Sequence, residues 1–173
     1  MGSEMCIRDR IYLAGVSNGG GMVLTMGATY PDYFAALIPI AAPLTVDQSG
    51  IDKLKNQPMW LIHTKADATV QPENSVLPLY KSLITSGATN KWFSYFETAT
   101  GTDLPGTEYD GHWAWIYFFH DQVIGVQHPE NTKNWDGYSG MVATDPTNGG
   151  GSRASVNGQT YNSIFDWMSA QRH

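Results

Sequence analysis

The sequence predicts an α/β protein in which about four mostly parallel strands are flanked by helices. Short apolar runs alternate along the chain with segments of helical periodicity, and polar loops follow the apolar runs. A chain of 173 residues with 42% hydrophobic and 12% aromatic residues suits one domain with a buried core. We therefore expect a single sheet with a ligand site outside the carboxyl ends of its strands.

The first predicted strand covers residues 11–14 and breaks into the turn Gly15-Val16-Ser17-Asn18-Gly19. A G-x-S-x-G turn between a strand and a helix is the nucleophile elbow of serine hydrolases, although an ordinary glycine-rich turn is the alternative for Ser17. The helix that follows is expected over residues 19–30 and ends before Pro31. The side chains expected to face the sheet are Met22, Val23, Met26 and Ala28.

Two more strands are predicted by apolar runs at residues 34–42 and 58–63, with a short helix at 46–56 between them. Continuous apolar character suits parallel strands covered on both faces, and Pro39 is expected near the end of the first run. Asp67 lies in the polar loop after the second run. A helix is then expected over residues 72–86, with proline in its first turn, and a fourth strand over residues 91–96.

The remaining segments are predicted to be less regular. A loop rich in Gly, Asp and Thr at residues 98–111 leads to His112, and a short aromatic helix follows at residues 113–119. Residues 127–160 form a long irregular loop, which we expect to be mobile because few of its side chains can pack. An amphipathic helix is expected over residues 161–172.

Three of these positions form the residue set of a catalytic triad. A serine hydroxyl is a poor nucleophile at neutral pH, so it needs a histidine to accept its proton and a carboxylate to orient that histidine. Ser17, Asp67 and His112 occur in the chain order of α/β-hydrolases, which differs from the orders of chymotrypsin-like and subtilisin-like enzymes. We therefore predict that Ser17 is the nucleophile, Asp67 the acid and His112 the base.

Other residues compete for these roles. Asp67 could instead cap a helix or stabilise its loop, and Asp103, Glu108 and Asp110 are rival acids that lie close in sequence to the predicted base. His63 is a rival base, but its place at a strand end just before the acid loop favours a hydrogen-bonded structural role. The triad assignment remains the preferred hypothesis.

Four motifs stand out in the chain: Gly15-Val16-Ser17-Asn18-Gly19-Gly20, Trp60-Leu61-Ile62-His63 leading to Asp67, Asp110-Gly111-His112, and Ile164-Phe165-Asp166-Trp167-Met168. Together they resemble α/β-hydrolases of the esterase/prolyl-oligopeptidase-like group, especially polyhydroxybutyrate-depolymerase-like and feruloyl-esterase-like members. The resemblance implies that the backbone amide of Asn18 is half of an oxyanion hole. Tryptophans such as Trp113 and Trp115 are more often core than site residues, but Trp113 directly follows the predicted base and is therefore the candidate residue for lining the acyl or alcohol pocket.

The resemblance also implies that about four strands and a second oxyanion loop precede the nucleophile strand. Residues 10–173 are therefore expected to be an N-terminally truncated domain, about the C-terminal half of an α/β-hydrolase fold. Residues 1–9 resemble translated sequencing adapter and are expected to be a non-native tail that holds Cys6. We expect the exposed nucleophile strand to promote self-association, and loss of one oxyanion donor to lower the rate by roughly 10²- to 10³-fold.

The expected activity is hydrolysis of a small-molecule or polymer ester through an acyl-enzyme. A serine peptidase of the prolyl-oligopeptidase type and a non-catalytic binding domain of the same fold are the alternatives. A net charge of -6 and a pI near 5.2 argue against nucleic-acid binding, and no apolar stretch predicts a membrane span. We expect no cofactor and no metal, since His120, His128 and His173 lack ligand spacing. The resemblance favours a secreted or periplasmic location.

Overall fold

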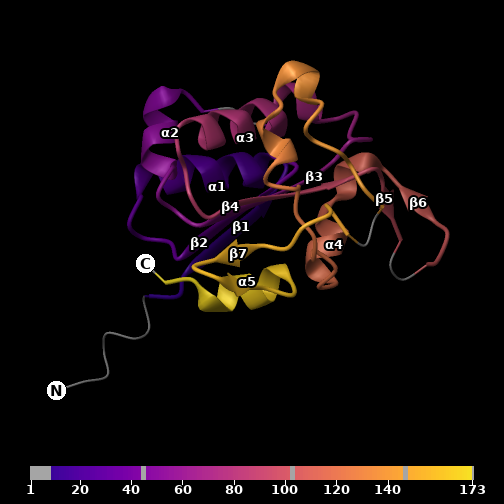
Figure 1. Ribbon diagram of the computed structural model, residues 1–173. Coiled ribbons are helices and arrows are strands. Elements are labelled where there is room, and N and C mark those ends of the chain that lie inside the picture. Colours follow the sequence, from indigo (N-terminus) through magenta and orange to yellow (C-terminus); the bar gives the residue numbers. More distant parts are fainter. Residues whose placement is uncertain (1–8, 44–45, 102–103, 146–147, 173) are drawn as a thin grey trace.

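A four-stranded parallel sheet is the centre of the computed structural model, which describes residues 9–43, 46–101, 104–145 and 148–172 (Figure 1). The tail at residues 1–8 with Cys6, together with Asp103 and His173, lies outside the described residues. Neighbouring strands pair in chain order, and their bounds are β1 (Tyr12–Val16), β2 (Ala36–Ile40), β3 (Met59–Thr64) and β4 (Lys91–Phe96). The predicted α/β class and the four strands are confirmed.

Three connecting helices lie on one face of the sheet: α1 (Asn18–Thr29), α2 (Gln48–Leu54) and α3 (Val76–Thr85). Because each strand pairs with the preceding one in a constant direction, right-handed crossovers place every connecting helix on the same side. The opposite face is covered by α4 (Trp115–Phe119) and α5 (Ile164–Ala170), which follow the last strand of the sheet (Figure 1).

Each face of the sheet carries its own hydrophobic core. Along β3, Met59 and Leu61 belong to the core under α1 to α3, whereas Trp60 and Ile62 belong to the core under α4 and α5. This alternation is the two-residue period of a strand. All residues of β2 and β3 are buried, as expected for interior parallel strands. Trp60 meets Trp167 of α5 edge to face at a centroid distance of 5.4 Å, which fixes that helix on the sheet.

The predicted helix over residues 72–86 is two elements, the 3₁₀ turn η1 (Pro72–Asn74) and α3. Ser75 lies between them with φ -138° and ψ -92°, and its hydroxyl donates to the Gln71 carbonyl at 2.8 Å. Pro78 is the third residue of α3, and proline is tolerated only in the first turn of a helix because it has no amide hydrogen and its ring clashes with the carbonyl four residues earlier. A continuous helix through Asn74 and Ser75 is therefore unfavourable, which accounts for the break. On α1, Val23 is buried as predicted, but Met22 is 57% exposed because consecutive helical residues point about 100° apart.

The predicted loop at residues 98–111 contains an antiparallel hairpin of β5 (Ala99–Thr100) and β6 (Glu108–Tyr109). The Thr100 amide donates to the Tyr117 hydroxyl at 2.7 Å, and that hydroxyl donates to the Thr98 carbonyl at 2.8 Å. The buried tyrosine therefore ties the hairpin to α4. The 3₁₀ turn η2 (Gly111–Trp113) joins the hairpin to that helix.

The described part of residues 127–160 (127–145 and 148–160) contains short elements, and much of it is hydrogen-bonded along β4. The Tyr95 amide donates to the Gly149 carbonyl at 2.8 Å, and the Glu97 amide donates to the Thr144 carbonyl at 2.7 Å. Buried Gln127 also donates to the Gly149 carbonyl at 3.1 Å. The free edge of β4 supplies these partners, so the expectation of a mobile loop is not supported here. The short elements within residues 127–160 are η3 (Asn131–Lys133), η4 (Asp136–Tyr138), β7 (Ser155–Val156) and β8 (Gln159–Thr160).

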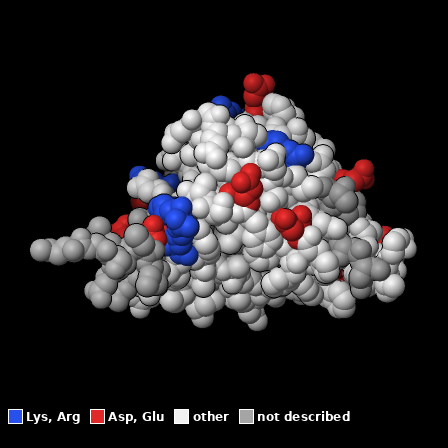
Figure 2. Space-filling view, turned by 90° about the horizontal axis from the view of Figure 1, so that it is seen from below, with Lys and Arg blue, Asp and Glu red and all other residues white. Residues whose placement is uncertain are grey.

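The surface has few charged side chains on the side seen in Figure 2, and acidic and basic groups are interspersed there. The negative net charge of -6 is therefore not gathered into one acidic patch on this side. Within the described ranges, no helix combines the length and apolar character needed to cross a membrane.

Candidate active site

The turn after β1 holds Ser17 in the backbone conformation of a nucleophile elbow. Ser17 has φ 55° and ψ -123°, a region that residues other than glycine rarely adopt. Its amide donates to the Ile40 carbonyl of β2 at 2.9 Å, and its carbonyl accepts from the Gly21 amide at 3.0 Å. These bonds fix the turn between the sheet and α1, so Ser17 lies at the carboxyl edge of the sheet.

Glycine is required where β1 and α1 approach each other. A Cβ on Gly15 would lie 2.3 Å from the carbonyl oxygen of Gly19, and a Cβ on Gly20 would lie 2.8 Å from the Ile40 carbonyl oxygen. A Cβ on Gly19 would meet nothing within 4 Å. The close backbone approach therefore explains two of the four glycines around the serine, Gly15 and Gly20.

Asp67 is held rigidly in the loop after β3. Its side chain is buried, Oδ1 accepts from the Thr69 amide at 2.9 Å and the Val70 amide at 2.7 Å, and Oδ2 lies 2.8 Å from His112 and 3.3 Å from His63. Burial alone would raise the pKa of Asp67. The hydrogen bonds from His63, the Val70 amide and His112 outweigh burial and lower the pKa from 3.8 to about 2. Asp67 is therefore an anion at neutral pH.

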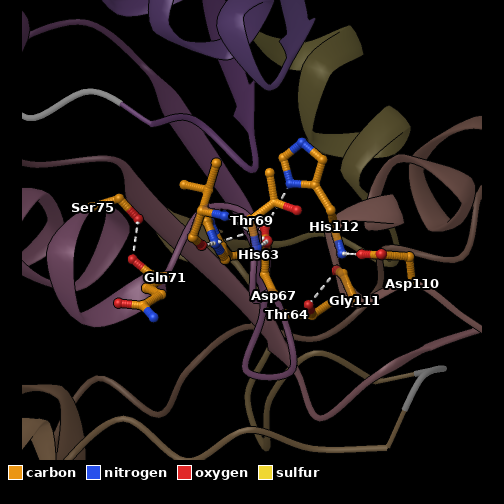
Figure 3. Close-up of polar contacts among 10 residues, drawn as sticks. His63, Thr64, Asp67, Thr69, Gln71, Ser75, Asp110, Gly111 and His112 are labelled. Atoms are coloured by element: carbon orange, nitrogen blue, oxygen red, sulfur yellow. Dashed lines mark hydrogen bonds and ion pairs between the residues drawn. The ribbon is translucent and has the colours of Figure 1, made fainter.

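The turn that carries His112 is attached to the Asp67 loop through its backbone. The Thr64 hydroxyl donates to the Gly111 carbonyl, and the Asp110 carboxylate accepts from the His112 amide at 2.8 Å (Figure 3). A Cβ on Gly111 would lie 2.3 Å from the carbonyl carbon and oxygen of Ala66. Only glycine therefore allows this approach without displacing one of the two loops.

His112 and Asp67 form an acid–base pair. His112 Nδ1 lies 2.8 Å from Asp67 Oδ2, and Figure 3 shows the imidazole directed toward the carboxylate. Because an ionised carboxylate only accepts, Nδ1 carries the hydrogen and Nε2 keeps a lone pair. The His112 side chain is 14% exposed, so its ring is partly open to solvent. The pair can take up a proton at Nε2 and stabilise the resulting imidazolium.

The predicted nucleophile lies at the same edge of the sheet as this pair. Ser17 follows β1 and Asp67 follows β3, with β2 between the two strands. Adjacent strands are about 4.8 Å apart, so the ends of β1 and β3 are separated by about 10 Å. Asn18 is the first residue of α1, and its amide is one of the N–H groups that a helix leaves without an internal partner.

The rival residues take other positions. Asp110 bonds the backbone of His112 rather than its ring, and Glu108 is exposed on β6. His63 is fully buried beside the acid, which excludes it as a base that substrate can reach. The sequence predicts a structural role for His63, but we did not predict its contact with Asp67 or the hydrogen bond from the Thr64 hydroxyl to the Gly111 carbonyl. Their place as the last two residues of a strand before the acid loop is the signal that points to both.

A row of aromatic rings begins at His112. The Trp115 ring lies 6.1 Å from the His112 ring, and the Trp113 ring lies 5.5 Å from Trp115 and 5.4 Å from Tyr109, all between centroids. Trp113 is 42% exposed. The rings are inclined to one another, at 84° between His112 and Trp115 and 36° between Trp115 and Trp113, and they place aromatic surface next to the Asp67–His112 pair.

The comparison with solved structures shows a similarity to an esterase. A solved structure described as a thermostable esterase matches with 31% sequence identity and a TM-score of 0.55, over 66% of this chain and 29% of that one. No protein-family model and no curated protein matches the chain. The similarity supports a hydrolase fold, and the four-stranded parallel sheet with its flanking helices is consistent with part of an α/β-hydrolase domain.

Proposed function

We propose that the chain carries the catalytic residues of a serine hydrolase that cleaves carboxylic esters. The observation that carries this proposal is the 2.8 Å contact between His112 Nδ1 and anionic Asp67, at the sheet edge where Ser17 has a positive φ. The similarity to a thermostable esterase supports an ester rather than an amide as substrate. That similarity covers 29% of the esterase chain, so the activity of the whole protein is part of the proposal.

The proposed reaction proceeds through an acyl-enzyme. Ser17 Oγ attacks the ester carbonyl carbon while its proton passes to His112 Nε2, and the carbonyl electron pair moves onto oxygen. The Asn18 amide donates to that oxyanion. Collapse of the tetrahedral intermediate breaks the bond to the alcohol oxygen, which takes the proton from His112. Water then repeats the sequence on the acyl-enzyme, releases the acid and regenerates Ser17.

Asp67 keeps its negative charge through the whole cycle. With its pKa lowered to about 2, it stays ionised wherever His112 can act as a base. It holds the imidazole in the Nδ1–H tautomer and opposes the positive charge that develops when Nε2 is protonated.

Trp113 is the proposed substrate-binding residue. Its exposed ring continues the aromatic row that starts beside His112, so an apolar part of a small-molecule or polymer ester can stack there while the carbonyl lies near Ser17. Trp113→Ala is expected to raise KM for esters with large apolar groups more than for acetate esters, because the short ester does not reach the ring.

A fluorophosphonate probe tests the assignment, because it reacts with activated serines. We expect labelling of the chain that is absent in Ser17→Ala, together with hydrolysis of p-nitrophenyl esters. Equal signal in both proteins would refute Ser17 as nucleophile and favour a non-catalytic binding domain. Faster cleavage of Xaa-Pro peptides than of esters would instead identify a peptidase of the prolyl-oligopeptidase type.

A further inference from the structure

The last two residues of β3 contact the loops that carry Asp67 and His112, one from each face of the sheet. His63 and Thr64 are both fully buried, and the two-residue period turns His63 toward the α3 face and Thr64 toward the α4 face. We infer that His63 and Thr64 are positioning residues that hold the acid and the base in register before substrate binds. The effect on turnover rests on the proposed function, whereas the effect on the geometry of the pair does not.

Thr64 holds the turn that carries the base. Its hydroxyl donates to the carbonyl of Gly111, the residue immediately before His112. Gly111 also packs closely on Ala66, since a Cβ added to Gly111 would lie 2.3 Å from the carbonyl carbon and oxygen of Ala66. One hydrogen bond, from Thr64, and one close backbone contact, with Ala66, therefore attach Gly111 and the turn that carries His112 to the end of β3 and the loop after it.

His63 holds the loop that carries the acid. Its Nε2 lies 2.8 Å from the Val70 carbonyl oxygen. The same nitrogen lies 3.3 Å from Asp67 Oδ2, and Figure 3 shows the two side chains next to each other. Both oxygens only accept, so Nε2 carries the ring hydrogen and shares it between them. Nδ1 is buried with no hydrogen-bond partner in the described part of the chain, and a hydrogen there would be an unsatisfied donor. The contacts therefore select the Nε2–H tautomer.

With this tautomer, the His63 N–H faces Asp67 as well as Val70. Oδ1 of Asp67 accepts from the Thr69 and Val70 amides, and Oδ2 accepts from His112 Nδ1 and lies 3.3 Å from His63 Nε2. A carboxylate offers about four lone-pair sites, so an N–H group lies at or near each of them. Without the His63 N–H, Oδ2 keeps one donor and the carboxylate gains freedom to turn away from the base.

Two pairs of variants test the inference in the full chain. His63→Leu removes the N–H, whereas His63→Gln keeps an amide N–H; Thr64→Val removes the hydroxyl, whereas Thr64→Ser keeps it. We expect the Leu and Val variants to lower kcat for p-nitrophenyl acetate about 10-fold, the effect of one hydrogen bond, with KM unchanged. The Gln and Ser variants should recover most of the loss. A purely structural role would lower the melting temperature without this split between kcat and KM.

Nuclear magnetic resonance gives a readout that does not depend on activity. The His112 Nδ1 proton should appear far downfield and disappear in His112→Asn. We expect His63→Leu and Thr64→Val to shift or broaden this resonance, and the two conservative variants to keep it. A long-range proton–nitrogen spectrum of the unaltered chain should show His63 as the Nε2–H tautomer, so one arm of the test needs no variant to fold.

The outcomes separate this inference from the proposed function. A His63 Nδ1–H tautomer, or a His112 resonance unchanged in both His63→Leu and Thr64→Val, would overturn the positioning role. The expected spectra in a chain that hydrolyses no ester would refute the esterase proposal and still support the positioning role.

Discussion

Replacing Gly111 with alanine should separate the acid from the base. A Cβ at this position would lie 2.3 Å from the carbonyl carbon and oxygen of Ala66 and 2.7 Å from the Asp67 amide nitrogen. Ordinary carbon contacts need about 3.5 Å, so the two loops must move apart by about 1.2 Å. A shift of that size along the bond from His112 to Asp67 would lengthen it from 2.8 Å to about 4 Å, beyond hydrogen-bond range.

The loss of activity should be large. Misplacing a catalytic group by about 1 Å costs about 10²-fold in rate, so we expect kcat/KM of Gly111→Ala for p-nitrophenyl acetate to fall about 100-fold. The downfield Nδ1 proton resonance of His112 should disappear as well. Circular dichroism during heating shows whether the variant remains folded at the assay temperature.

Gly151→Ala is the matched control, because a Cβ there meets nothing within 4 Å and its φ needs no glycine. We expect this variant to keep the activity, the resonance and the unfolding midpoint of the unaltered chain. If Gly111→Ala behaved like the control in activity and in the resonance, the inference from close backbone approach would be wrong.

Three further changes test the pKa shifts and the core. The pKa of Asp67 is lowered from 3.8 to about 2, so its contribution to stability is full above pH 3.8 and is lost as pH falls through about 2. Asp67→Asn should therefore lower the free energy of unfolding in urea by about 2 kcal/mol at pH 7, and the variant should lose less stability than the unaltered chain as the pH is lowered. Burial lowers the pKa of Lys91 from 10.5 to about 7, so the unfolded chain binds more protons between these values and stability should rise with pH there. Lys91→Met should abolish that rise in thermal unfolding at pH 7 and pH 9.5. Trp167 is fully buried against Trp60 and donates to Asn90 at 2.9 Å, so Trp167→Ala should cost about 3–5 kcal/mol by calorimetry, and Trp167→Phe less.

The strands of the sheet are predictable from local sequence, whereas the segment that bonds the edge of β4 depends on contacts between residues far apart in the chain. The apolar runs of β2 and β3 predict these strands because an interior parallel strand must be apolar on both faces. Nothing local indicates that Thr144 and Gly149 bond the edge of β4, since those bonds use backbone groups that every sequence has. The break before α3 has a local signal in Pro78, because proline belongs in the first turn of a helix and not in the middle of one.

The pairing of Asp67 with His112 is predictable for a chemical reason, whereas the contacts of His63 and Thr64 are only partly so. Asp67 and His112 belong to the few residue types that can act as orienting acid and base, and each lies where a strand or loop reaches the carboxyl edge. His63 and Thr64 act through strand periodicity and through distances to Val70 and Gly111, which only a three-dimensional structure provides. The sequence shows a glycine at position 111, but the requirement for glycine there comes from the close approach of the Ala66 backbone in the neighbouring loop.

Because Thr64 and Ala66 hold Gly111 by its backbone, the base is placed from β3 rather than from the hairpin that precedes it. The turn between β5 and β6 can then lengthen or change sequence without moving His112, since added loop residues cost little chain entropy. Gly106 marks a suitable point, with φ 83° and nothing near its Cβ position. The hairpin is thus a place where the chain can accept added residues beside an unchanged Asp67–His112 pair.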